Sequence, residues 1–238
     1  MKNIILVFFL TFSTLFHAQT ESSFFTKTDA FLNKYVKNGK VTYEAIKKNS
    51  DELTEILKIA ADISIDDESV ATQKAFWINA YNLNVIKGVL NKFPIKSPLD
   101  ISGFFDKITY QVANKKLTLN DIESKMIRSK YKDPRFHFAL VCGALGCPPI
   151  INKAYLPATV EAQLTNQTRI AINNSSFIKV NDDAKSVALS QIFEWYKDDF
   201  VSKGVTYIDF LNKYKADKIP DNYKTSYYTY DWALNKVK

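Results

Sequence analysis

The sequence feature that most constrains the fold is a long helical pattern over residues 66–93, which stops at Pro94. Apolar residues recur along one face at helical spacing, and Asn82 lies in the middle of that apolar stripe. The other sides carry three large aromatic side chains, Phe76, Trp77 and Tyr81. A helix that is apolar all round has to be covered on every side, so we expect it to lie at the centre of the core.

Shorter patterns fill the rest of the chain and predict one compact domain. Further helices are expected at residues 22–37, 43–60 with a break near Ser50, 119–130 after a capping box at Thr118, 153–172, 190–200 and 206–214. Strand pairs are expected at 107–112 with 117–119 and at 177–180 with 187–189, and single strands at 136–141 and 227–232. This pattern favours an α+β fold: a helix-rich single domain with small antiparallel β hairpins around a buried long central helix.

The N-terminus reads as an export signal over residues 1–18. Lys2 precedes an almost unbroken apolar run, residues 4–16, which is shorter than the roughly 20 residues that span a bilayer. Cleavage after Ala18 would leave a mature domain of residues 19–238 without a transmembrane segment. We therefore expect a periplasmic or secreted protein.

Charge narrows the class of partner. The formal net charge is +7, and removing the signal lowers it to +6 because Lys2 is lost. The lysines are scattered among acids along the whole chain, whereas a nucleic-acid surface needs basic residues gathered in a patch. We expect an unknown ligand, or a small-molecule or peptide substrate, rather than nucleic acid, and we expect no cofactor.

Residues 135–149 hold the chemically most reactive side chains. Both cysteines, Cys142 and Cys147, lie there with His137, the only histidine that remains once the signal is removed. In an exported protein the two cysteines suggest a disulfide, although its very short loop would add little stability. Alternatively, Cys142 is a nucleophilic thiolate stabilised by backbone N–H groups of the glycine-rich loop that follows it. Zinc held by the three residues is a third alternative, but their spacing matches no zinc signature.

The predicted strand at 136–141 separates two of these residues. His137 and Cys142 are an odd number of positions apart, so an uninterrupted strand would direct them to opposite faces. A direct Cys–His pair would require a bulge or turn near Val141.

Two further polar residues are candidates for the site. Buried Asn82 needs hydrogen-bond partners, which makes it either a core amide that anchors a loop or an orienter of a catalytic group. Glu123, one turn into the helix after the capping box and beside apolar residues, is the best candidate among the acids. Most helix acids are simply solvated, so both interpretations of Glu123 stay open.

Taken together, several segments resemble the widespread family catalogued as domain of unknown function 547. The matching residues are 41–43, 75–82, 117–123 with Arg128, 133–140, 142–144, 147–149, 195–196 with 199–200, and 230–232. The resemblance implies an exported bacterial member of a family without an established reaction. Many members look like Ile-Glu-His where this chain has Ile122-Glu123-Ser124. Plant relatives look to lack His137 and Cys147, which leaves Cys142, Glu123 and Asn82 as the shared polar set.

Two functional hypotheses follow. In the first, the protein is a periplasmic binding or envelope module with a polar pocket formed by Cys142, Glu123 and Asn82 and a Cys142–Cys147 clamp. In the alternative, it is a cysteine-dependent hydrolase or acyl transferase with Cys142 as nucleophile and His137 or Glu123 moving protons. The oxidising compartment and the serine at position 124 favour the first.

Overall fold

The structure, a computed structural model, describes residues 22–201 and 204–237. The predicted export signal, residues 1–18, lies outside the described residues. None of the helices in the described part is long and apolar enough to cross a bilayer. Helices predominate, and the strands form small sheets, which confirms the predicted α+β class.

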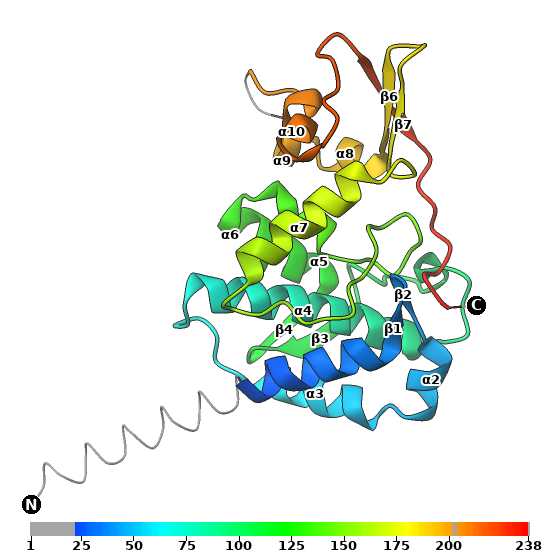
Figure 1. Cartoon of the computed structure of the whole chain (residues 1–238). Coiled ribbons are helices and arrows are strands. Elements are labelled where there is room, and N and C mark those ends of the chain that lie inside the picture. The colour runs from blue at the N-terminus through cyan, green and yellow to red at the C-terminus, as the bar shows by residue number, and fades with distance from the viewer. Residues whose placement is uncertain (1–21, 202–203, 238) are drawn as a thin grey trace, which may run out of the picture.

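The long helix α4 (Val70–Leu90) runs through the middle of the molecule (Figure 1). It begins at Ser69, whose side chain accepts a hydrogen bond from the backbone N–H of Thr72. Every side chain from residue 75 to residue 86 is buried. The prediction that this helix is covered on all sides is therefore confirmed.

Helices and a hairpin from the N-terminal part pack on one side of α4 (Figure 1). They are a helix over residues 22–35, α2 (Tyr43–Lys48) and α3 (Asp51–Asp62), and the break between the last two lies at Ser50 as predicted. A short hairpin, β1 (Val36–Lys37) and β2 (Lys40–Val41), turns through Asn38 and Gly39, both with positive φ. Asn-Gly favours such a turn. The first helix therefore ends at residue 35, whereas the sequence pattern predicts its end at residue 37.

A second hairpin leads into a helix that contains the predicted acid. After η1 (Pro98–Asp100), strands β3 (Thr109–Val112) and β4 (Lys115–Thr118) pair, and a capping box at Thr118 opens α5 (Leu119–Asp121) as predicted. The next segment, η2 (Ile122–Arg128), is a π-helix, and α6 (Ser129–Tyr131) ends the run. The π-helix is a difference from the regular helix that the sequence predicts, and π turns are frequent at functional sites.

The C-terminal half adds a three-stranded sheet and four helices. The strands lie in the order β5 (Ile178–Asn181), β6 (Ser186–Ser190) and β7 (Lys224–Tyr228), with β6 and β7 parallel. The helices are α7 (Val160–Asn173), α8 (Gln191–Trp195), α9 (Lys197–Phe200) and α10 (Tyr207–Tyr214). The strand predicted at 227–232 corresponds to β7, which begins at residue 224 and ends at residue 228. From β7 the chain returns toward β1 and β2 (Figure 1).

The predicted strand over residues 136–141 is wrong. Residues Pro134–Phe138 form a 3₁₀-helix, η3, that starts at a proline, and the Asp133 side chain accepts a hydrogen bond from the N–H of Arg135. A short apolar run such as residues 136–141 is compatible with either a buried strand or a helical turn, so its apolar content does not distinguish between them.

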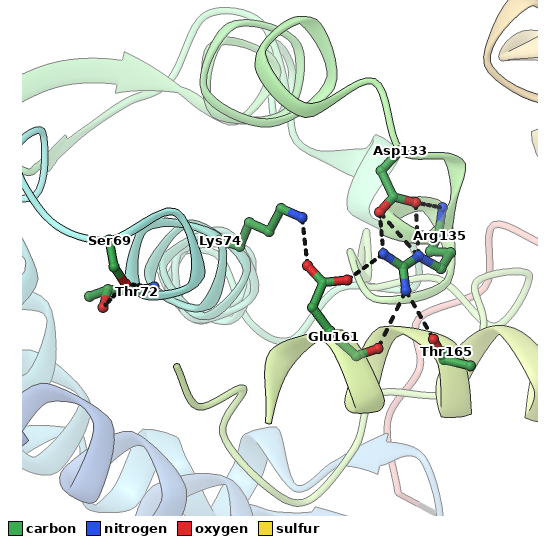
Figure 2. A network of polar contacts seen from close by, with 7 residues as sticks. All are labelled: Ser69, Thr72, Lys74, Asp133, Arg135, Glu161 and Thr165. Atoms are coloured by element: carbon green, nitrogen blue, oxygen red, sulfur yellow. Dashed lines mark hydrogen bonds and ion pairs between the residues drawn. The ribbon is translucent and has the colours of Figure 1, made fainter. Parts of the chain in front are cut away.

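Polar contacts fasten η3 to the helices on either side (Figure 2). The Arg135 guanidinium lies 2.6 Å from Asp133 and 2.5 Å from Glu161 of α7, and it donates to the Thr165 hydroxyl at 2.9 Å. Glu161 also pairs with Lys74 of α4 at 2.6 Å. The segment that carries His137 is therefore held against two long helices.

Candidate functional site

A cavity of about 420 Å³ gathers most of the sequence-predicted residues. Its aromatic wall comprises Tyr81, Phe105, Trp195, Tyr196, Tyr230 and Trp232. Its polar lining comprises Asp106, Asn120, Glu123, His137, Cys142 and Cys147. Three of the four predicted site residues, Cys142, His137 and Glu123, thus share one cavity. Asn82 does not line it.

The two cysteines are free thiols, which corrects the predicted disulfide. The Tyr230 hydroxyl donates to the Cys147 sulfur at 2.9 Å and lies 3.1 Å from the Cys142 sulfur. The backbone N–H of Cys142 also donates to the Cys147 sulfur at 3.0 Å. The sulfurs are thus satisfied by hydrogen bonds and do not lie at disulfide distance.

These contacts distinguish the two thiols. Burial and the neighbouring Cys147 raise the pKa of Cys142 well above its usual range. Burial also acts to raise the pKa of Cys147, but hydrogen bonds from Cys142, Tyr230 and Ala144 outweigh it, so this pKa is lowered. Of the two thiols, Cys147 is therefore the one whose charged form the hydrogen bonds favour.

The loop between the cysteines is held by the C-terminal segment. Leu145 N–H donates to the Ala233 carbonyl at 2.7 Å, and Gly146 N–H donates to the Asp231 carbonyl at 2.8 Å. Those N–H groups are therefore not free to hold an anion, which corrects part of the expectation for this loop. A Cβ atom at Gly146 would lie 2.8 Å from the Tyr230 ring, so the close approach of this tyrosine requires glycine.

His137 is paired with Asp199, an acid that the sequence analysis does not predict as a site residue. Its Nε2 atom lies 2.6 Å from the Asp199 carboxylate, which also accepts from Arg128 Nε at 2.6 Å. Burial tends to raise the pKa of Asp199, but His137 and Arg128 lower it well below its usual range. The His137 ring also packs on Tyr196 with 4.2 Å between centroids. The Asp199 carboxylate thus engages Nε2, and not Nδ1, of the His137 ring.

Glu123 lies on the π-helical turn, next to two tyrosines. Burial raises the pKa of Tyr196, and the charge and hydrogen bond of Glu123 raise it further. Burial and the Glu123 charge likewise raise the pKa of Tyr81. Both phenols therefore stay protonated, and the Tyr196 hydroxyl is hydrogen-bonded to the carboxylate.

Ser124, the residue after this acid, lies outside the cavity. Its side chain is exposed and donates to the Asn120 carbonyl at 2.5 Å. It lines a separate depression together with Arg128 and Asp199.

Asn82 anchors the segment that leads to Cys142. Its amide donates to the Ala139 carbonyl at 3.0 Å and accepts from the Val141 N–H at 2.9 Å. One helical turn earlier, Asn79 binds both backbone groups of Tyr155 in the same manner. These contacts bear out the structural interpretation of Asn82, in which a core amide anchors the cysteine loop.

Sequence reasoning missed Asp199, Tyr230, Trp195 and Trp232 as site residues. They lie more than forty positions after the cysteine segment, so no local spacing connects them to it. The signal that could have found them is their place within the motifs that carry the family resemblance.

The described residues contain no set of side chains that could bind zinc as the third alternative requires. Within residues 22–201 and 204–237, no three or more His, Cys, Asp or Glu side chains are arranged to hold a metal ion.

Comparison with known proteins gives one match. Residues 65–170 match the model of a family described as protein of unknown function, DUF547. This segment contains α4, the π-helical turn, η3 and both cysteines. No curated protein and no solved structure matches the chain.

Proposed function

We propose that this protein, whose residues 65–170 match the DUF547 family model, is an exported cysteine-dependent acyl hydrolase or acyl transferase. The family description supplies no reaction. One observation carries the proposal: two free thiols bridged by Tyr230 open into the same cavity as the His137–Asp199 pair and Glu123. Nucleophile, proton carrier and acid are thus gathered in one place.

Residues 1–18 have the pattern of an export signal, and export would bring the thiols into an oxidising compartment. There a solvent-exposed cysteine pair would readily oxidise. Cys147 is buried, and both sulfurs are engaged by the Tyr230 hydroxyl. Hydrogen bonding and burial therefore favour persistence of the reduced pair.

The hydrogen bonds favour Cys147 over the sequence-predicted Cys142 as nucleophile. The Cys147 thiolate would add to an acyl carbon, forming a C–S bond while the bond to the leaving oxygen, sulfur or nitrogen breaks. The leaving group takes a proton from His137 or Glu123. Water or another acyl acceptor then attacks the thioester, returns a proton to the same group and releases the thiolate. Atoms, charge and protons balance over the cycle.

The remaining residues would position these groups. Asp199 binds Nε2 of His137 and so directs the proton-carrying role to Nδ1. Tyr230 donates to the Cys147 sulfur and lies beside Cys142, so its loss would change the charge on the thiol pair. Asn82 holds the backbone just before Cys142.

The alternative is a binding module without turnover. The aromatic wall of the cavity favours ligand binding of either kind, since aromatic side chains line most small-molecule sites. A binding module held by a Cys142–Cys147 disulfide clamp is not supported, because both cysteines are free thiols.

The test is turnover of an activated acyl substrate, p-nitrophenyl acetate, and of an acyl thioester by the mature chain. We expect an acyl adduct on Cys147 in intact-mass spectra, and a loss of about 100-fold or more in rate for Cys147→Ser. Cys142→Ser is the matched control, with smaller loss. Should the adduct and the loss follow Cys142 instead, the nucleophile is Cys142. Equal rates in wild type and both variants would refute a thiol-dependent reaction.

A further inference from the structure

The charge of the cavity is opposite to that of the chain. The protein carries 32 lysines and arginines and a net charge of +7. Among the described residues that line the cavity there is no lysine or arginine, but there are two carboxylates, Asp106 and Glu123. Arg128 does not line the cavity; its guanidinium lies over the Tyr196 ring, 4.4 Å from the centroid, is paired with Asp199 and also interacts with the charge of Glu123. His137 is paired with the same acid.

The second observation is an aromatic shelf, formed by Trp195, Trp232, Tyr230 and Phe105. The Trp195 and Trp232 rings stack with 5.8 Å between centroids at 28°, and Tyr230 lies 5.0 and 4.8 Å from them. Phe105 lies 6.2 Å from Trp232. Trp195 is 46% exposed, although such a side chain is usually covered. The faces of these rings carry negative electrostatic potential.

The shelf is held in place before any ligand arrives. The Asn120 N–H donates to the Phe105 carbonyl at 2.9 Å, which ties the loop of Phe105 and Asp106 to the start of α5. The Tyr230 N–H donates to the Gln191 side chain at 2.9 Å, and its hydroxyl is held by the cysteines. A preorganised surface loses little conformational entropy on binding.

Aromatic faces next to carboxylates form a site for a positive organic group. We infer that this cavity binds an ammonium cation, primary or quaternary, with its charge against the aromatic shelf and Asp106 and Glu123 nearby. The inference deepens the proposed function, on which it rests, by naming the substrate class: an acyl compound or acyl acceptor that carries an ammonium group. Anions are disfavoured because the lining formed by the described residues includes carboxylates and no lysine or arginine.

The test compares choline with 3,3-dimethyl-1-butanol, a neutral compound of the same shape. Binding to the mature chain is followed by tryptophan fluorescence. Trp77 is buried in α4, so a change reports on Trp195 and Trp232. We expect saturable choline binding about tenfold or more tighter than that of the alcohol. Equal affinities, or no saturation by choline, would overturn the inference.

Variants locate the binding. Asp106→Asn should weaken choline binding several-fold and leave the alcohol unchanged, whereas Asp217→Asn, which removes the same charge outside the cavity, should change neither. Trp195→Ala should weaken choline binding while thermal unfolding stays near that of wild type. If Asp106→Asn and Asp217→Asn act alike, the effect is one of net charge and the site is refuted.

A Cys142→Ser/Cys147→Ser double variant separates this inference from the proposed function. The double variant should still bind choline although it cannot form a thioester. Thiol-dependent turnover without choline binding would refute the cation site alone. Choline binding without thiol-dependent turnover would refute the reaction alone.

Discussion

At the scale of single residues, Tyr230 is the side chain that determines the behaviour of the thiol pair. Its hydroxyl contacts both sulfurs, and its ring packs directly on Gly146. Without this donor, Cys147 would keep the cost of burial and lose one of the hydrogen bonds that favour its charged form.

We predict that Tyr230→Phe raises the pKa of Cys147. A hydrogen bond to a charged group contributes about 1.5–3 kcal/mol, so the midpoint of the alkylation-rate profile should rise by about 1–2 pH units. Iodoacetamide labelling, read by mass spectrometry of the Cys147 peptide, measures it. Tyr228→Phe is the control, because that hydroxyl donates to the Phe177 carbonyl instead. An unchanged midpoint would remove Tyr230 from this role.

At this scale the sequence is most informative where a reactive residue type occurs only once or twice in the chain. The two cysteines and the one histidine outside the N-terminal segment line a single cavity, and the predicted acid Glu123 lines it as well. Asp199 and Tyr230 could not be ranked above other acids and tyrosines, because their role depends on contacts formed only after the chain folds. The disulfide expectation failed because cysteine count and compartment do not determine the distance between two sulfurs.

At the scale of elements, the segment from η3 to Cys142 is positioned by contacts from three directions. Arg135 fastens its start, Asn82 holds Ala139 and Val141, and the C-terminal segment holds the loop that follows. Neither cysteine lies in a helix or strand, so the positions of the two sulfurs depend on these contacts rather than on regular secondary structure.

We predict that Asn82→Ala destabilises the protein by about 1–3 kcal/mol for each buried backbone group left without its partner. Urea unfolding measures the free energy. The control is Asn33→Ala, at an exposed position of the first helix, which should change stability by less than about 0.5 kcal/mol. A loss no greater than that of the control would show that the amide does not anchor this loop.

Helices and hairpins were predictable where strong local signals exist. The capping box at Thr118 and the break at Ser50 are as expected, because side-chain caps act locally. The 3₁₀ turn at η3 and the π turn at η2 were not predicted; η3 packs against α7 and η2 against α4, contacts that the local sequence does not show. The family match covers residues 65–170 and so includes the predicted segments at 75–82, 117–123 and 133–140.

At the scale of the whole molecule, residues distant in sequence meet around α4 and the cavity. The C-terminal segment passes from β7 to the cysteine loop and on to β2, with bridges at Leu234 and Lys236 (Figure 1). Asp199, from the C-terminal half, joins His137 and Arg128 of the family segment. Stability and site therefore share residues.

We predict that Asp199 makes stability depend on acid. Its pKa is lowered in the folded protein, so its contribution is complete above the ordinary carboxyl pKa and is lost as pH falls below about 4. Thermal unfolding of wild type should therefore drop between neutral and strongly acidic pH more steeply than that of Asp199→Asn. Asp217→Asn, which removes an exposed carboxyl, should keep the wild-type slope. Equal slopes for wild type and Asp199→Asn would contradict the ion-pair arrangement.

The most direct test of a reactive thiol pair in this cavity is alkylation of the mature protein, purified without reductant, followed at each cysteine over a range of pH. We predict two free thiols and modification of Cys147 at a lower pH than Cys142. A Cys142–Cys147 disulfide, or two thiols that resist alkylation until the protein unfolds, would contradict the proposed nucleophile and the function built on it.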